Sequence, residues 1–244
     1  MRSGWKGRPN EHAADHRVGG RVRTVTHKGD TAEAGGQGIH TNYDEMLGLL
    51  GEYGLAGDLF PNVERAQYIS KRGKPKTSRI KEDLSMMVGP RGIADLVKFR
   101  NRYVTHAREH PQFEIDREIT AYDDVSGAEE FARYGEGFRD FVLRPMAHAM
   151  ANTTPEHTNL YYLVNGLRLA MTTEISSLAG GNERLLEAMA AKSEVRLGTK
   201  VASLEMDGDR IDGVRLENGE AIKAKHVIVT TPALAAQKVA ARAA

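Results

Sequence analysis

The sequence contains no cysteine, which excludes disulfides, thiolate metal sites and a cysteine-linked cofactor. It also lacks an excess of charge of either sign, because 34 Lys and Arg residues stand against 33 Asp and Glu residues, for a net charge of +1. Domains that bind nucleic acid concentrate basic charge on one face. This balance therefore argues against a nucleic-acid partner.

Long apolar runs are lacking as well. No stretch of the sequence reaches the roughly 18–20 apolar residues that span a bilayer. Arg2, Lys6 and Arg8 are not followed by the apolar segment of a secretory signal. We therefore expect a cytoplasmic chain without a transmembrane segment. Its 244 residues are enough to bury a core, as one large or two small domains.

The sequence contains no recognisable catalytic constellation. His106 and His110 lie four residues apart, but Pro111 places them at a helix end, where cations are favoured. A Gly-x-Ser-x-Gly motif is absent, and no candidate nucleophile has a base beside it. We predict no metal site, and the catalytic residues stay unassigned.

Two glycine pairs are the most informative feature that the sequence does contain. Gly19 and Gly20 precede Arg21, and Gly35 and Gly36 follow about a dozen residues later. Glycine tolerates positive φ and has no Cβ, so main-chain N–H groups can approach an anion closely. The planar guanidinium of an arginine suits a pair of phosphate oxygens. On these residues alone, a plain tight turn with a solvated arginine is the commoner interpretation.

Several blocks of the sequence resemble one family. The segment from Arg17 to Thr24 resembles the Gly-Gly-Arg segment of the flavin-containing amine oxidoreductases, the superfamily of amine oxidases, protoporphyrinogen oxidase and phytoene desaturases. The similarity continues in the same order as in the family, through residues 33–39, 43–55, 177–186 and 195–232.

This resemblance implies a cofactor, a reaction and a set of binding residues. The cofactor is FAD, bound noncovalently, and the reaction is oxidation of an apolar or amine-bearing small molecule by hydride transfer to the flavin. Residues 19–21 would lie at the pyrophosphate, residues 35–37 at the isoalloxazine and Val201 at the adenine. The implied cofactor-binding residues are Gly19, Gly20, Arg21, Gly35, Gly36, Gln37 and Val201.

Part of the family pattern is missing. The family opens with a strand, a Gly-x-Gly-x-x-Gly turn and a helix that hold the pyrophosphate, and the polar stretch from Met1 to Arg17 lacks that motif. Ala13 or His12 stands where the family has a ribose-binding glutamate, and Glu11 is displaced. We interpret the chain as truncated at both ends and expect it to hold FAD weakly. The alternative is a non-catalytic fragment that binds no flavin and acts, if at all, through protein association.

Hydrophobic periodicity predicts a mixed α/β fold. We expect an incomplete Rossmann-like FAD-binding domain, residues 1–60 and 176–244, with a three-stranded antiparallel meander, and a mainly helical substrate-binding domain, residues 61–175, inserted in its middle. Expected helices are 43–53 (capped by Asn42), 89–110, 128–135, 137–150 (kinked or split in two at Pro145) and 160–171. Expected strands are 22–27 and a hairpin of 67–70 and 74–79. The meander is expected to contain strands 200–206 and 210–217, with a turn at Asn218-Gly219. A buried parallel strand is expected at 226–230.

Overall fold

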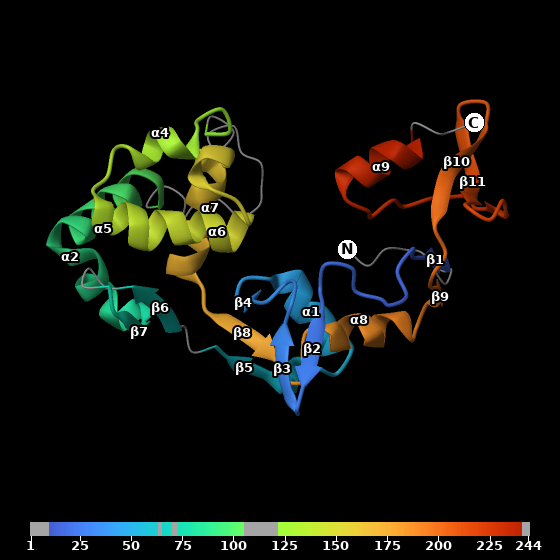
Figure 1. The fold of residues 1–244 in the computed structure, drawn as a ribbon. Helices are drawn as coiled ribbons and strands as arrows, with labels where there is room; N and C mark the ends of the chain where they lie inside the picture. Colours follow the sequence, from blue (N-terminus) through green and yellow to red (C-terminus); the bar gives the residue numbers. More distant parts are fainter. Residues whose placement is uncertain (1–9, 63–64, 70–72, 105–121, 241–244) are drawn as a thin grey trace. The chain divides into compact units, whose positions relative to one another are not determined.

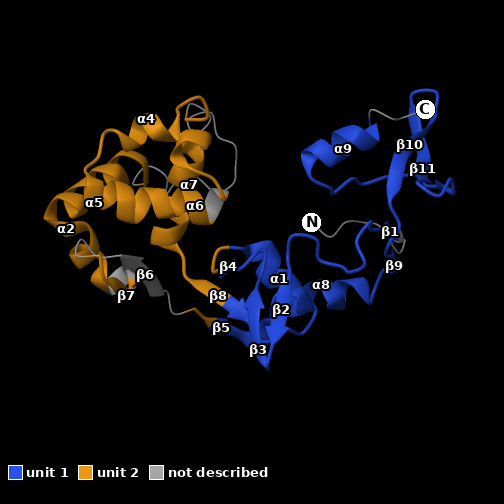
Figure 2. Cartoon of the chain, in the orientation of Figure 1, with its two compact units in different colours: residues 1–39, 43–60, 177–244 blue, residues 40–42, 61–176 orange. Residues whose placement is uncertain are grey.

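A computed structural model describes residues 10–62, 65–69, 73–104 and 122–240 of the chain. The described residues form two compact units (Figure 2). Those within 1–39, 43–60 and 177–244 belong to the first unit, and those within 40–42 and 61–176 belong to the second. The content is a mixture of helices and small sheets, as the periodicity predicts (Figure 1).

The first unit begins with a strand that the sequence did not indicate. Strand β1, Asn10–His12, pairs in parallel with β9, Glu194–Arg196. Its residues are polar and show no alternation of apolar and polar positions, so local pattern gives no sign of a strand. The pairing with a distant segment, rather than local propensity, creates β1.

A hairpin and a helix follow β1. Strands β2, Thr24–His27, and β3, Asp30–Glu33, pair antiparallel, which confirms the expected strand near residues 22–27. Helix α1, Asp44–Glu52, confirms the expected helix. Its N-cap, however, is Tyr43 without a side-chain hydrogen bond, so the predicted Asn42 cap is wrong.

The apolar core of the first unit is formed by α1, helix α8, Glu183–Ala190, and those residues of a three-stranded sheet, of order β4-β8-β5, that belong to this unit. The strands are β4, Ile39–His40, β5, Leu59–Pro61, and β8, Ile175–Leu178, with a short 3₁₀ turn, Ala56–Asp58, before β5. The buried core residues are Ile39, Leu50, Leu55, Leu178 and Leu185.

The expected antiparallel meander is confirmed in the same unit. Its strands are β10, Val201–Asp207, β11, Arg210–Leu216, and β12, Ala221–Lys223, in the order β10-β11-β12. Gly208 and Gly219 adopt positive φ values of 59° and 90° in the two connecting turns. The chain then continues to helix α9, Ala233–Ala240.

The predicted strand at residues 226–230 is wrong. The segment forms no strand, and Ile228 and Val229 are 80% and 43% exposed. A parallel strand is stable when neighbouring strands satisfy its backbone and both faces are covered. In the described part of the chain no strand pairs with this segment, so its apolar pattern has nothing to pack against.

The second unit starts with the expected hairpin and a long helix. Strands β6, Arg65–Ile69, and β7, Pro75–Arg79, pair antiparallel. Helix α2, Ile80–Phe99, begins earlier than predicted and is broken at Gly89, whose φ of 71° and ψ of 175° are not helical. A π-helical turn, Arg100–Val104, follows it, and the rest of the predicted helix, 105–110, lies outside the described residues.

Shorter helices complete the second unit. Helix α4, Gly127–Phe131, is capped by the Ser126 hydroxyl, and α7, Leu160–Thr172, is capped by the Asn159 side chain. The helix expected at 137–150, kinked or split at Pro145, is divided into α5, Glu136–Phe138, and α6, Arg144–Ala151, but the division is a π-helical turn at Arg139–Leu143. Pro145 lies in the first turn of α6, where its missing N–H costs little. A 3₁₀ turn, Pro155–His157, precedes α7.

A buried carboxylate lies within the aromatic core of the second unit. Glu130 is 1% exposed, and the Tyr134 hydroxyl donates a hydrogen bond of 2.6 Å to its Oε1. Its Oε2 lies 3.3 Å from the Arg133 guanidinium. Burial, and then hydrogen bonding to Glu130, raises the pKa of both Tyr103 and Tyr134, so both phenols remain hydrogen-bond donors.

His12 in β1 is expected to make the stability of the first unit depend on pH. Burial, and then the charge of Arg196, lowers the pKa of His12 below 6.5. Neither ring nitrogen has a hydrogen-bond partner among the described residues. Because the folded pKa is the lower one, the unfolded chain binds the proton more readily, and the free energy of unfolding should fall as pH drops below about 6.5.

Unfolding by urea at pH 7.5 and pH 5.5 tests this effect. We expect His12→Gln to lose part of the pH dependence, because the titrating group is gone. The control is His16→Gln, which removes an exposed histidine near the same strand and should leave the dependence unchanged. Equal pH dependence in His12→Gln and wild type would contradict the prediction.

Candidate functional site

The first glycine pair forms a tight turn in the first unit. The Val22 N–H donates to the Gly19 carbonyl at 2.9 Å and closes the turn. Gly19 and Gly20 have φ values of 101° and 53°, in the region that favours glycine. A Cβ on Gly19 would lie 2.7 Å from the Val22 oxygen, whereas no described atom lies within 4 Å of the Cβ position of Gly20.

The second glycine pair lies directly against this turn. The Gly36 N–H donates to the Arg21 carbonyl at 3.0 Å, and the Ala34 N–H donates to the Arg23 carbonyl at 2.7 Å. A Cβ on Gly35 would lie 2.0 Å from the Arg21 oxygen, so only glycine allows the two segments to approach this closely. The structure therefore brings residues 19–21 and 35–36 together.

Gln37 lies with the two glycine turns. Among the described residues, no hydrogen bond links Val201 to them. The Asn182 side-chain amide donates to the carbonyls of Gly36 and Gln37, both at 3.1 Å. Val201 lies at the start of β10, where it pairs with Leu216. Of the seven predicted residues, six lie at the two turns and one lies in the meander.

Arg17 organises the first turn, a role that no sequence pattern indicated. Its Nη1 donates to the carbonyls of Val18 and Val22 at 2.9 and 3.1 Å, and its Nη2 donates to the Gly20 carbonyl at 2.6 Å. Nη1 also lies 3.0 Å from Glu183 Oε1. An arginine before a turn looks in sequence like an ordinary solvated residue, so only the fold identifies it.

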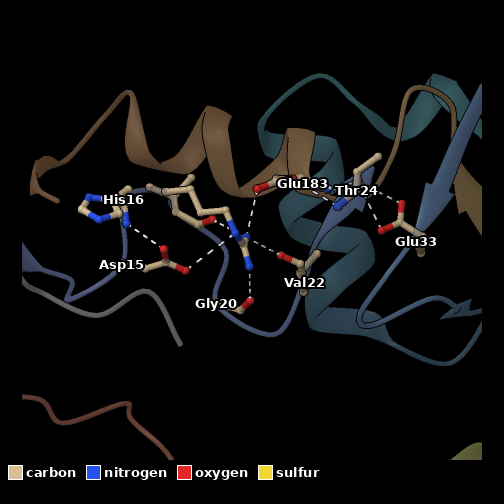
Figure 3. Close-up of polar contacts among 9 residues, drawn as sticks. Asp15, His16, Gly20, Val22, Thr24, Glu33 and Glu183 are labelled. Carbon is tan, nitrogen blue, oxygen red and sulfur yellow. Dashed lines mark hydrogen bonds and ion pairs between the residues drawn. The ribbon is translucent and has the colours of Figure 1, made fainter. Parts of the chain in front are cut away.

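The N-terminus of α8 supports both turns (Figure 3). Glu183 Oε2 accepts a hydrogen bond from the Thr24 N–H at 3.1 Å, and the Thr24 hydroxyl donates to Glu33 at 3.1 Å. Glu33 Oε1 also accepts from the Asn182 N–H at 2.7 Å. These contacts fix α8 to the strands that carry the two turns.

The turn presents hydrogen-bond donors on the side away from Arg17. In a trans peptide the C=O and the following N–H point in opposite directions. The carbonyls of Val18 and Gly20 point to Arg17, so the N–H groups of Gly19 and Arg21 point away from it. The exposed Arg21 guanidinium has no hydrogen-bond or ion-pair partner among the described residues. Outward N–H groups beside a free guanidinium are the chemistry of an anion site.

The position expected for a ribose-binding carboxylate carries none. The Ala13 N–H donates to the Arg196 carbonyl at 3.1 Å, and the Ala13 carbonyl accepts from the Thr199 N–H at 2.8 Å. Glu11 is exposed in β1, with Val195 as its Cα partner. Among the described residues there is no group of three His, Asp or Glu side chains that could hold a metal ion, and no helix long and apolar enough to cross a membrane.

Solved structures with the same fold are enzymes of several kinds. A putrescine oxidase redesigned for cofactor binding has a TM-score of 0.70 at 19% identity, with 91% of this chain and 52% of that chain covered. Cyclohexylamine oxidase from Brevibacterium oxydans IH-35A has a TM-score of 0.71 at 20% identity, with 94% and 53% covered. A fatty acid isomerase from P. acnes that produces CLA has a TM-score of 0.67 at 15% identity, with 93% and 53% covered.

These comparisons establish the fold and the family together. The chain spans about half the length of the solved structures that it matches. No curated protein sequence matches it. The family of flavin-containing amine oxidoreductases matches residues 14–243, which is nearly the whole chain. The protein belongs to the flavin-containing amine oxidoreductase family.

Proposed function

We propose that the protein of this chain is an FAD-dependent oxidoreductase that oxidises an apolar or amine-bearing small molecule. The observation that carries the proposal is the pair of joined glycine turns, whose outward N–H groups lie beside the exposed Arg21. This arrangement suits a diphosphate, since main-chain donors and a guanidinium both favour phosphate oxygens. The family's flavin supplies such a group.

The residues present fit FAD at this place. Residues 19–21 would hold the pyrophosphate, residues 35–37 would contact the isoalloxazine, and Val201 would meet the adenine. The open space at Gly20 leaves room for a ligand, because no described atom occupies the place of its Cβ. When bound, FAD supplies the hydride acceptor, and the protein positions the substrate and excludes water. On this proposal, residues 1–60 and 176–244 bind the cofactor and residues 61–175 bind the substrate.

The substrate class rests on the structural neighbours and is correspondingly broad. Two of them are named for amines, putrescine and cyclohexylamine, and a third is named for a fatty acid. An apolar or amine-bearing small molecule covers this range. The catalytic residues stay unassigned, in keeping with chemistry that the cofactor performs.

Titration of the chain with FAD, followed by quenching of flavin fluorescence, tests the proposal. We expect Arg21→Ala to weaken FAD binding roughly ten- to a hundredfold, because a charge-assisted hydrogen bond contributes about 1.5–3 kcal/mol. The matched control is Arg23→Ala, which removes an exposed arginine two residues away. It should leave the affinity close to that of wild type.

Two results would contradict the proposal. If Arg21→Ala binds FAD as wild type does, Arg21 is not part of the site. If the wild-type chain shows no saturable binding of FAD at all, the alternative of a fragment that binds no flavin is favoured. In an FAD-loaded sample, loss of flavin absorbance on anaerobic addition of an amine would support the amine-bearing class of substrate.

A further inference from the structure

We propose that Arg17 is the positioning residue that gives the Gly19–Arg21 turn its affinity for a diphosphate, and that Glu183 holds Arg17 in place. The role of Arg17 is to orient peptide groups, not to contact the ligand. The diphosphate rests on the proposed function, whereas the orientation of the turn can be measured in the protein without any ligand.

The Arg17 guanidinium binds three backbone carbonyl oxygens, which would otherwise be able to face the ligand. The carbonyls of Val18, Gly20 and Val22 all accept hydrogen bonds from Arg17, at 2.6–3.1 Å. The Arg17 side chain is 29% exposed, and the Glu183 side chain is 17% exposed. Carbonyl oxygens repel a phosphate, so gathering three of them on one side leaves donors on the other.

The turn needs this constraint because its own hydrogen bond, from the Val22 N–H to the Gly19 carbonyl, does not hold the central Gly20–Arg21 peptide. Gly19 and Gly20 have no Cβ, so their peptide groups can rotate at little steric cost. Without the guanidinium, rotation of the Gly20–Arg21 peptide would turn the Gly20 oxygen outward and the Arg21 N–H inward. The affinity of the turn for an anion would then fall even though Arg21 itself is unchanged.

The ion pair with Glu183 distinguishes the positioning role of Arg17 from a long-range attraction between the charge of Arg17 and the ligand. Its Oε1 lies 3.0 Å from Arg17 Nη1, so the two charges largely cancel, and its Oε2 accepts from the Thr24 N–H. A neutralised pair attracts a distant anion only weakly. The remaining contribution of Arg17 is the planar arrangement of its several guanidinium N–H donors. A lysine cannot reproduce this arrangement, because all of its donors lie on one nitrogen.

NMR on the full chain, isotopically labelled, tests the proposal with Arg17→Lys and Arg17→Met. The first readout is the chemical shift and hydrogen exchange of the Gly19, Gly20 and Arg21 amides without ligand. The second is the dissociation constant for inorganic pyrophosphate. The matched control is Arg184→Met, because Arg184 donates to the Ala179 carbonyl and to Asp58 in the same unit, and neither partner is a residue of the turn.

We expect both Arg17 variants to shift the three amides and to weaken pyrophosphate binding by about tenfold or more, since each lost charged hydrogen bond contributes on that scale. Arg184→Met should change neither readout. Wild-type amide shifts and wild-type pyrophosphate affinity in Arg17→Lys would overturn the proposal, because charge alone would then suffice. If an Arg17 variant does not fold, Glu183→Gln, which keeps the size of the side chain, should show the same two changes in weaker form.

Failure of the proposed function has a different signature. If wild type does not bind pyrophosphate but the Arg17 variants still shift the turn amides, the FAD site is wrong at this place and Arg17 only orders the turn. If wild type binds pyrophosphate and the Arg17 variants bind it equally well, the FAD site stands and the role of Arg17 is refuted.

Discussion

Glu130→Ala is expected to destabilise the second unit by about 1–3 kcal/mol. Glu130 is 1% exposed and accepts a hydrogen bond of 2.6 Å from the Tyr134 hydroxyl. Its removal leaves the half-buried Tyr134 hydroxyl without this acceptor, at a cost of about 1–3 kcal/mol. Arg133 is 53% exposed and can return to water, so it adds little to the loss.

Helical circular dichroism during urea unfolding measures this effect. Glu129→Ala is the matched control, because Glu129 is exposed on the same helix, α4. We expect its unfolding midpoint to stay within the usual small range of surface substitutions. Glu130→Gln should lie between the two variants, since it keeps one oxygen acceptor in a side chain of the same size. A midpoint for Glu130→Ala equal to that of Glu129→Ala would show that the buried carboxylate is not needed.

Gly35→Ala is expected to separate the two glycine turns and to destabilise the first unit by about 2–4 kcal/mol. Its Cβ would lie 2.0 Å from the Arg21 carbonyl oxygen and 3.1 Å from the Arg23 nitrogen, both in the backbone. Backbone atoms cannot move aside as a flexible side chain can. Overpacking of this kind costs about 1–3 kcal/mol, and loss of the Gly36–Arg21 hydrogen bond adds about 1 kcal/mol.

Gly36→Ala is the control for this substitution. Its Cβ would make an ordinary contact of 3.6 Å with Val22 Cγ2. We therefore expect Gly36→Ala to unfold at nearly the wild-type urea concentration and Gly35→Ala to unfold much earlier. Equal midpoints would mean that the two turns do not lie as close as the hydrogen bond between Gly36 and Arg21 requires.

The sequence predicted those features that local pattern or family resemblance specifies. The Asn218-Gly219 dipeptide marks a hairpin turn, and the meander around it is confirmed. The apolar spacing of residues 160–171 gives helix α7, Leu160–Thr172. The resemblance also selected residues 19–21 and 35–37, which the fold brings to the same place.

Features that depend on distant partners were not predicted correctly: one strand was missed, and another was predicted but does not form. Strand β1 exists because β9 pairs with it, although its residues are polar. Residues 226–230 have the apolar composition of a buried strand but form none, because no described strand lies beside them. Arg17 and Glu183 have ordinary surface chemistry in sequence, and their roles arise only when the turn and α8 meet. The cofactor contacts of residues 19–21, residues 35–37 and Val201 stay predictions.

The contact between Arg17 and Glu183 also bears on how this protein is made. The two residues are 166 positions apart, and the second unit is encoded between them. During synthesis the Gly-Gly-Arg segment leaves the ribosome early. Its carboxylate partner, Glu183, is translated only after the whole helical unit. Contacts of such long sequence separation form slowly, because a large loop must close first. The first unit should therefore complete its folding after the second, with its glycine turns among the last parts to reach their final form.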